Sequence, residues 1–138
     1  MIAQTEWKHD EVYEGRTESG NTVQFDANSA HQYGPSPMEA VLMALCSCTS
    51  VDVVGILKKK RQALTGLRVS AEATQAETAP KVFTKIHLTY TVSGRVSRKA
   101  AEDAVALSKN KYCSVSLMLS KAMPIDCAIV FADGEPEP

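Results

Sequence analysis

Residues 35–62 read PSPMEAVLMALCSCTSVDVVGILKKKRQ and contain a long apolar stretch. Its beginning carries helix-start signals: Ser36 suits the cap, the proline after it suits the first helical position, and Glu39 completes a Ser-x-x-Glu capping box. It closes with the basic run 58–61, which is favourable at the C-terminal end of a helix dipole. These signals predict a helix over about residues 37–62.

This predicted helix has no wide polar face. Between Met38 and Leu57 only six residues are not apolar: Glu39, Ser47, Thr49, Ser50, Asp52 and Gly55. A helix that is apolar nearly all round must be covered on every side, and a chain of 138 residues is short for enclosing about seven turns. The pattern therefore predicts that a second copy of the chain supplies the missing cover, so we expect a homodimer.

Length and composition fit one folded domain over residues 1–138, with a disordered tail from about residue 133. At 44% apolar residues the chain can build a core without a metal or a disulfide. The formal charge of −1 lacks the basic footprint of nucleic-acid binding. The first ten residues carry no apolar run typical of a signal peptide or membrane span. We therefore expect a cytoplasmic protein with neither nucleic acid nor membrane as partner.

The remaining segments predict strands and shorter helices. Alternation of apolar and polar residues predicts strands over 5–8, 12–13, 22–26, 67–76, 82–93 and 125–131. Ser97 predicts the cap of a helix that runs to about residue 109, and a shorter helix follows from Cys113 to about residue 122. This order predicts an α/β (α+β) fold in which antiparallel sheets pack around the long buried helix.

Four cysteines in a chain without a secretion signal indicate thiol chemistry or simple burial. In a helix, Cys46 and Cys48 point about 200° apart and cannot share a metal, and Cys46 falls on an apolar face as a core residue. Cys113 lies at a predicted helix start, where free amides favour the thiolate. Cys127 lies in an apolar strand, where burial would leave it inert. The three histidines show no ligand spacing, so we expect no metal and no cofactor.

The run from Pro35 to Val54, followed 65 residues after Cys48 by the YCSVS motif of residues 112–116, resembles the OsmC/Ohr family. These are the osmotically inducible and organic hydroperoxide resistance proteins, and the similarity follows nearly the whole chain in element order. The resemblance implies an intertwined homodimer in which two long helices pack together with sheets outside. It also implies a thiol peroxidase: Cys48 attacks an organic hydroperoxide, Cys113 resolves the sulfenic acid into a disulfide, and a dithiol reductant resets the pair.

The family also supplies a cation from an arginine that a glutamate orders. Arg16 stands in a comparable Gly-Arg loop, and a solvated turn arginine is an equally open interpretation. The family's glutamate position is Met38 here, so Glu39 is displaced by one residue, and on a regular helix it would lie about 180° from Cys48. Its capping box alone also explains its presence.

Asp52 falls one helical turn after Cys48. Two interpretations stay open at this point. Its charge would oppose a neighbouring thiolate, so that activation would need Arg16 or another cation. Alternatively, Asp52 bonds a backbone or serine group as a buried structural residue.

The leading hypothesis is a cysteine-based peroxidase of oxidative stress defence, with Cys48, Cys113, Arg16 and Glu39 as its catalytic residues. The second hypothesis is a non-enzymatic dimeric module that binds a small apolar ligand in a cleft beside Cys48. Reactivity separates the two, because an enzyme needs a hyper-reactive Cys48 at neutral pH and a binding module does not.

Overall fold

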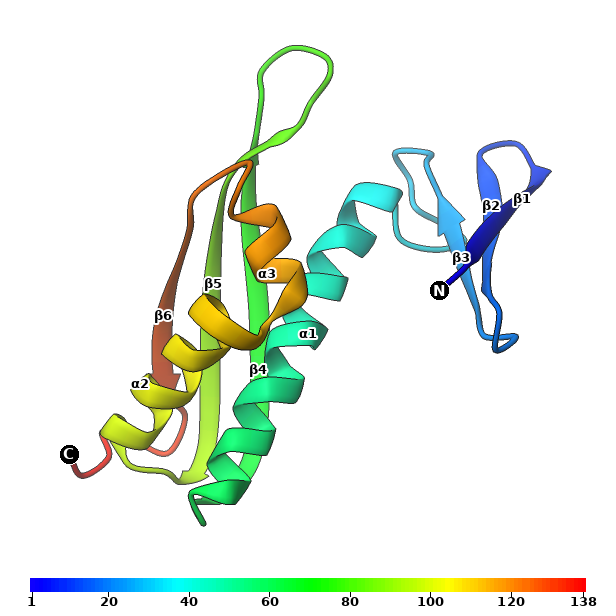
Figure 1. Cartoon of the computed structure of the whole chain (residues 1–138). Coiled ribbons are helices and arrows are strands. Elements are labelled where there is room, and N and C mark those ends of the chain that lie inside the picture. Colours follow the sequence, from blue (N-terminus) through cyan, green and yellow to red (C-terminus); the bar gives the residue numbers. More distant parts are fainter. The chain divides into compact units, whose positions relative to one another are not determined.

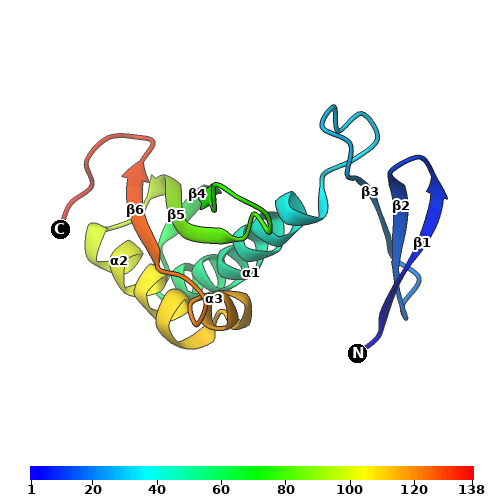
Figure 2. The ribbon, with the colours of Figure 1, turned by 90° about the horizontal axis from the view of Figure 1, so that it is seen from above.

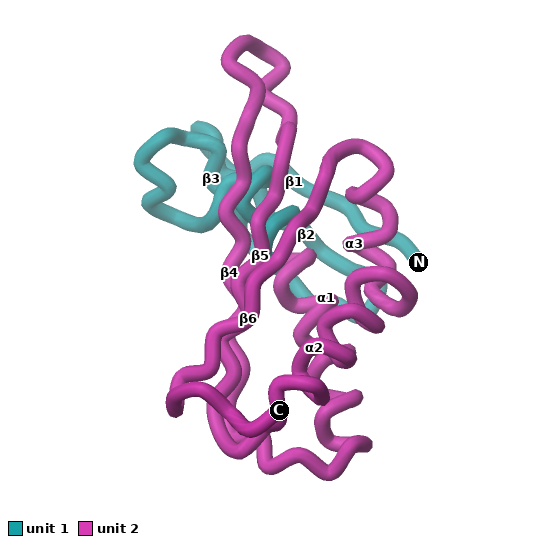
Figure 3. The backbone as a smooth tube through the Cα atoms, turned by 90° about the vertical axis from the view of Figure 1, so that its left-hand side faces the viewer, with its two compact units in different colours: residues 1–43 teal, residues 44–138 magenta.

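The computed structural model describes residues 1–138 and divides into two compact units, unit 1 (residues 1–43) and unit 2 (residues 44–138), coloured separately in Figure 3. In chain order the elements are β1 (Ala3–His9), β2 (Val12–Thr17), β3 (Thr22–Asp26), α1 (Pro37–Lys59), β4 (Ala63–Gln75), β5 (Phe83–Arg95), α2 (Arg98–Leu107), η1 (Ser108–Tyr112), α3 (Ser114–Leu119) and β6 (Ile125–Phe131). That all 138 residues act as a single domain stays a prediction.

Unit 1 is built on an antiparallel sheet with strand order β1-β2-β3 (Figure 1). The three strands confirm the alternation of the sequence. The loop that follows β3 is fastened by the buried Asp26, whose carboxylate accepts the N–H groups of Asn28 (2.9 Å) and Tyr33 (3.1 Å). Gly34 passes so close to β3 that an added Cβ would lie 2.3 Å from the Gln24 carbonyl oxygen, so only glycine fits there.

The start of α1 confirms the predicted capping box. Ser36 Oγ accepts the Glu39 N–H (3.1 Å), and a Glu39 carboxylate oxygen accepts the Ser36 N–H (2.9 Å). The helix ends at Lys59, three residues earlier than predicted. Arg61 adopts a left-handed conformation with φ of 57°, and the Gln62 N–H turns back to the Leu57 carbonyl at 3.0 Å, which closes the helix.

Unit 2 packs helices on one face of the sheet β4-β5-β6 (Figure 2). The long β4–β5 hairpin is antiparallel, as predicted, but β6 runs parallel to β5, in register from Ile86–Ile125 to Val92–Phe131. The expectation of antiparallel sheets alone is therefore wrong. Between β5 and β6 the chain passes through α2, η1 and α3, and such a crossover returns it to the end of the sheet where β5 began.

The core of unit 2 lies between α1 and β5. The α1 residues Leu45, Thr49, Val53 and Leu57 form a stripe at every fourth position and are completely buried, as are Ile86, Leu88 and Tyr90 at alternate positions of β5. Other apolar positions of α1 stay exposed, and Val51 is 73% exposed. A single chain therefore covers one stripe of α1 and leaves much of its apolar surface uncovered.

α1 is also long and apolar enough to cross a membrane by length and composition alone, a property that the core helix of a soluble protein can share. Length and composition therefore do not distinguish a membrane span from a core helix. The structure adds what composition cannot give: one stripe of α1 is buried inside unit 2.

The crossover helices follow the predicted signals with one addition. Ser97 Oγ accepts the Ala100 N–H (3.1 Å), which confirms the cap of α2. After Leu107 the helix widens into the five-residue π-helix η1, which the sequence did not predict, and Cys113 then caps α3. The expected disorder of residues 133–138 stays a prediction, and in this structure the Arg98 N–H donates to the Glu137 carbonyl at 3.1 Å.

Candidate functional site

The two thiols at Cys48 and Cys113 are neighbours in unit 2. Cys48 is half-buried on α1, Cys113 is fully buried at the junction of η1 and α3, and the Cys48 side chain is close enough to act on the pKa of Cys113. The fold thus brings together the two cysteines that the sequence analysis singled out, across 65 residues of chain.

The surroundings of Cys113 work against its ionisation. Its sulfur accepts the Ser116 N–H at 3.3 Å, the contact expected of a thiol that caps a helix. Burial nevertheless raises the pKa of Cys113 to about 11; the Ser116 bond opposes this rise, while the neighbouring Cys48 thiol and the charge of Asp52 add to it. The prediction that this position favours the thiolate is therefore wrong, because loss of water outweighs the amide.

A chain of buried hydroxyl groups runs beside the thiols. Ser108 Oγ donates to an Asp52 carboxylate oxygen at 2.9 Å and lies 2.7 Å from Thr49 Oγ1, which in turn lies 2.7 Å from the Tyr90 hydroxyl. Thr49, Ser108 and Tyr90 are completely buried. Of the two interpretations of Asp52, the bond to a serine is confirmed.

The Tyr90 hydroxyl stays protonated under all ordinary conditions. Burial is the main cause that raises the pKa of Tyr90 to about 12; a hydrogen bond with Thr49 opposes this, and the charges of Cys127, Cys113 and Cys46 add to it. Tyr90 is therefore a hydrogen-bond donor, at the end of this hydrogen-bonded series that is farthest from Asp52.

The other two cysteines are less buried than Cys113, and both lie close enough to Tyr90 to act on its pKa. Cys46 is half-buried on α1, and burial raises the pKa of its thiol. Cys127 is half-buried on β6, which is less enclosed than its apolar strand predicts. All four thiols are free.

Arg16 and Glu39 belong to unit 1. Arg16 Nη2 pairs with a Glu14 carboxylate oxygen at 3.3 Å. Glu39 lies 3.6 Å from His31 Nδ1, and the hydrogen bond from the Ser36 backbone N–H is the main cause that lowers the pKa of Glu39. The arginine is thus paired with a carboxylate other than the predicted one, and the carboxyl group of Glu39 serves the helix cap.

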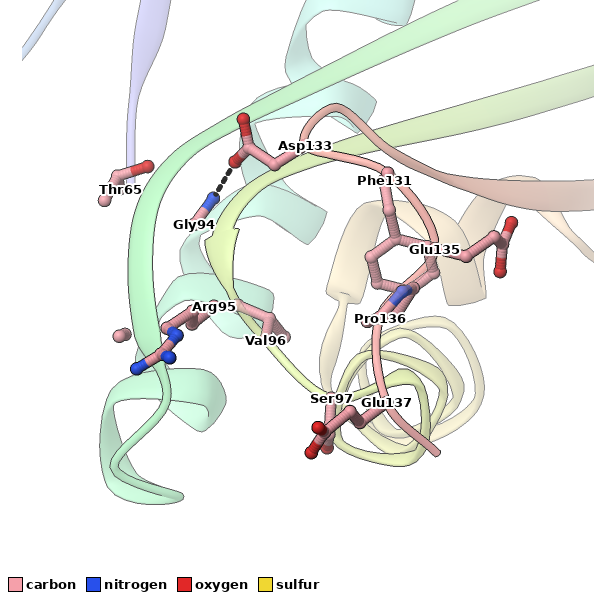
Figure 4. Close-up of a pocket in the computed structure, with 12 residues that line it drawn as sticks. Thr65, Gly94, Arg95, Val96, Ser97, Phe131, Asp133, Glu135, Pro136 and Glu137 are labelled. Atoms are coloured by element: carbon pink, nitrogen blue, oxygen red, sulfur yellow. Dashed lines mark hydrogen bonds between the residues drawn. The ribbon is translucent and has the colours of Figure 1, made fainter.

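Two hollows show where small molecules have room. One, of about 450 Å³ in unit 1, is lined by Arg16 beside apolar residues that include Val23 and Phe25. Another, of about 830 Å³ in unit 2, lies between the ends of β4 and β5 and the C-terminal residues (Figure 4), and no cysteine lines it. No group of three or more His, Cys, Asp or Glu side chains is placed to hold a metal ion.

Sequence reasoning missed three members of the buried chain: Thr49, Ser108 and Tyr90. The available signal was weak. Thr49 is one of few polar residues within the apolar stretch, and Ser108 ends an alanine-rich helical segment. A polar residue inside an apolar pattern needs a buried partner, but the pattern does not say which one.

Comparison with known proteins gives consistent results. Residues 29–128 match the family model of OsmC-like proteins. Protein YhfA of Escherichia coli K12 is 44% identical over 126 residues, which cover 91% of this chain and 93% of YhfA. The crystal structure of a hypothetical protein from Aquifex aeolicus is 31% identical with a TM-score of 0.82, over 94% of this chain and 96% of that one.

More distant solved structures share the fold. One from Legionella pneumophila, described as an organic hydroperoxide resistance protein OsmC, has a TM-score of 0.70 at 15% identity and covers 94% of this chain and 95% of that one. The long helix of this fold is a core helix and not a membrane span.

Proposed function

Because the chain belongs to the OsmC-like protein family, we propose that it is a cysteine-based peroxidase that reduces organic hydroperoxides in oxidative stress defence. The observation that carries the proposal is that the side chains of Cys48 on α1 and Cys113 at the start of α3 are neighbours, close enough for Cys48 to act on the pKa of Cys113. A disulfide forms only between cysteines whose Cα atoms lie within about 7 Å, so neighbouring cysteines from two different elements are the candidates for such a pair.

The proposed reaction is a two-electron exchange. The Cys48 thiolate attacks one oxygen of the peroxide, the O–O bond breaks, and the alkoxide leaves as an alcohol after taking up a proton. Cys48 is then a sulfenic acid. The Cys113 sulfur attacks the Cys48 sulfur, the S–O bond breaks, and the thiol proton leaves with the hydroxide as water. A dithiol reductant returns two electrons to the disulfide and restores both thiols.

The environments of the two thiols support unequal roles. The raised pKa of Cys113 keeps it as a neutral thiol at physiological pH, so it does not compete for the peroxide. Cys48 is half-buried and can meet a substrate, whereas Cys113 is fully buried and reacts only with its neighbour. This division fits Cys48 as the attacking thiol and Cys113 as the resolving one.

Arg16 and Glu39 complete the proposed site as the cation and the carboxylate that orders it. An apolar hollow lies beside Arg16 within unit 1 and has room for a small apolar group. In unit 1 the guanidinium of Arg16 is paired with Glu14, so its proposed role requires that this exposed pair open when substrate binds. An Arg16→Ala variant should slow peroxide consumption and leave the fold intact.

The experiment that tests the function is the intact mass after one equivalent of an organic hydroperoxide. We expect the loss of two protons in the wild type and in Cys46→Ser and Cys127→Ser, which serve as matched controls. Cys48→Ser should not react. Cys113→Ser should stop at the sulfenic acid and then over-oxidise. A disulfide that includes Cys46 or Cys127 as the main product would contradict the pairing.

The same proposal includes a cytoplasmic homodimer. Four free thiols suit a reducing compartment, and the exposed apolar residues Val51 (73%) and Met118 (65%) suit a surface that a second copy covers. The free energy of unfolding should then increase with protein concentration. A stable monomer at micromolar concentration in light scattering would refute the dimer.

A non-enzymatic binding module is the second candidate, and the apolar hollow of unit 1 favours it. A binding module would show four slowly reacting thiols and would still bind an apolar ligand after all cysteines are replaced by serine. A rapid reaction confined to Cys48 at neutral pH would decide for the enzyme.

A further inference from the structure

Ser108 bonds two parts of the thiol site, one through its side-chain hydroxyl and the other through its backbone carbonyl. Its hydroxyl donates to Asp52 on α1 at 2.9 Å, and its carbonyl accepts the Cys113 N–H at 2.8 Å. The second bond closes the five-residue π-helix η1, in which Ser108 is the first residue and which Cys113 directly follows. π-Helical turns are rare and occur frequently at functional sites. No other residue in the structure bonds both α1 and the Cys113 backbone.

The hydrogen bonds around Ser108 have only one consistent direction. A carboxylate is a stronger acceptor than a carbonyl group, so the single Ser108 hydroxyl proton points to Asp52 at 2.9 Å and not to the Thr49 carbonyl at 3.4 Å. Thr49 must then donate to Ser108, and the Tyr90 hydroxyl must donate to Thr49. Every buried side-chain polar atom in this region has a partner. A series of buried groups whose hydrogen bonds are all formed is rigid, and this series ends at the carboxylate of Asp52.

We propose that Ser108 is a positioning residue for the thiol pair, because it fixes the Asp52 carboxylate of α1 and the Cys113 turn against each other. This inference rests on the proposed function and deepens it, since it names the residue that sets the register between the two sulfurs. Asp52 acts as the charged element that Ser108 holds near Cys113. Ser108 touches neither peroxide nor sulfur with its hydroxyl, so it acts through Asp52 and the turn.

Charge supports this assignment. The carboxylate of Asp52 opposes ionisation of Cys113, in the same direction as Cys48 and burial, whereas the Ser116 N–H favours it. The groups that act on the pKa of Cys113 therefore come from α1 and α3, while Tyr90 on β5 is itself a group whose pKa the charge of Cys113 raises. Burial is the main cause that keeps the Cys113 thiol neutral, and a fixed Asp52 adds to it.

The test compares Ser108→Ala with Ser108→Thr in the otherwise unchanged chain. Two rates are measured by peptide mapping: formation of the Cys48–Cys113 disulfide with an organic hydroperoxide or a thiol oxidant, and alkylation of each cysteine under reducing conditions. Ser108→Ala should slow the disulfide on the order of tenfold, the effect of one lost hydrogen bond to a charged group. It should also speed the alkylation of Cys113 a few-fold, because the turn keeps its backbone bond but is no longer fastened to Asp52 and so admits water. Ser108→Thr keeps the hydroxyl and should restore both rates.

Cys46 and Cys127 are internal controls for a general loss of structure. If Ser108→Ala speeds the alkylation of all cysteines together, or changes neither rate, the positioning role is wrong. Tyr90→Phe is the matched control variant, since it removes a buried hydroxyl from the same chain without touching Asp52 or the turn. Tyr90→Phe should leave the alkylation rate of Cys113 relative to Cys46 unchanged.

Asp52→Asn tests the charge separately. It keeps an acceptor for the Ser108 hydroxyl and removes the negative charge, so alkylation of Cys113 should shift to lower pH. An unchanged pH profile would overturn the electrostatic part of the proposal. If the wild type forms no Cys48–Cys113 disulfide with any oxidant, the proposed function fails, whereas the alkylation rates still decide the role of Ser108.

Discussion

Two helices of this chain begin with the same local hydrogen bond in opposite surroundings. At the exposed start of α1, Ser36 Oγ accepts the N–H of Glu39, three residues ahead, at 3.1 Å. At the buried start of α3, Cys113 Sγ accepts the N–H of Ser116, again three residues ahead, at 3.3 Å. The pKa of Glu39 is lowered by the backbone hydrogen bond of Ser36, yet the pKa of Cys113 is raised by burial.

The opposite pKa shifts of Glu39 and Cys113 show whether hydrogen bonding or loss of hydration dominates at each helix start. Helix-start amides favour a negative charge wherever they are free to donate. At the surface, water still solvates the carboxylate, so the hydrogen bonds decide the direction of the shift. In the core, the charged form loses its water, and one weak bond to sulfur does not replace it. A capping motif therefore predicts the local bond, while only the tertiary surroundings predict the ionisation state.

In the buried region, the largest loss of stability is expected from a substitution at Thr49. Thr49→Val keeps the shape of the side chain but removes the acceptor of the Tyr90 hydroxyl, which then stays buried without a partner. We expect a loss of about 1–3 kcal/mol in the free energy of unfolding in urea. The double variant Thr49→Val with Tyr90→Phe should lose less than the sum of the single variants, because both polar partners are then absent. Strict additivity of the two losses would contradict this coupling.

The start of α1 was predictable because all of its determinants lie within four residues of each other. Ser36, Pro37 and Glu39 specify the cap locally, and the structure contains both reciprocal bonds. Ser97 predicted the cap of α2 for the same reason. Alternating strands were predictable as well, and the last one, Ile125–Phe131, has the predicted bounds.

The rest depended on contacts between distant residues. The parallel pairing of β6 and the bond from Ser108 to Asp52 join segments up to 56 residues apart, and no local pattern encodes them. For the candidate site, spacing and family resemblance identified Cys48 and Cys113. The ionisation of Cys113 was misjudged because its burial comes from the tertiary fold.

A second prediction sharpens the comparison at high pH. A thiol whose folded pKa is raised stabilises the fold fully below the unfolded pKa, and this contribution is lost as pH rises toward the folded pKa. For Cys113 the window runs from 9.0, the ordinary value, to about 11. Under reducing conditions the free energy of unfolding should fall across this window. Cys113→Ala should flatten the fall, and a slope equal to that of the wild type would show that Cys113 is not the group that titrates.

The smallest expected effect lies at the exposed cap. The pKa of Glu39 is lowered in the fold, so its carboxylate adds stability above the unfolded value of 4.5 and loses that contribution as pH falls through the folded value. Glu39→Gln keeps an acceptor for the Ser36 N–H but has no charge to titrate. The stability difference between the wild type and Glu39→Gln, measured by urea unfolding, should therefore shrink as the solution is acidified below 4.5.

Ser36→Ala separates the charge from the cap. It removes the hydroxyl that accepts the Glu39 N–H and should cost about 1 kcal/mol at neutral pH. The backbone N–H of residue 36, which is the main cause of the lowered pKa of Glu39, remains in place. Ser36→Ala should thus keep most of the acid dependence that Glu39→Gln loses. If Ser36→Ala and Glu39→Gln lose the acid dependence equally, the Ser36 hydroxyl and not the backbone N–H controls the ionisation of Glu39.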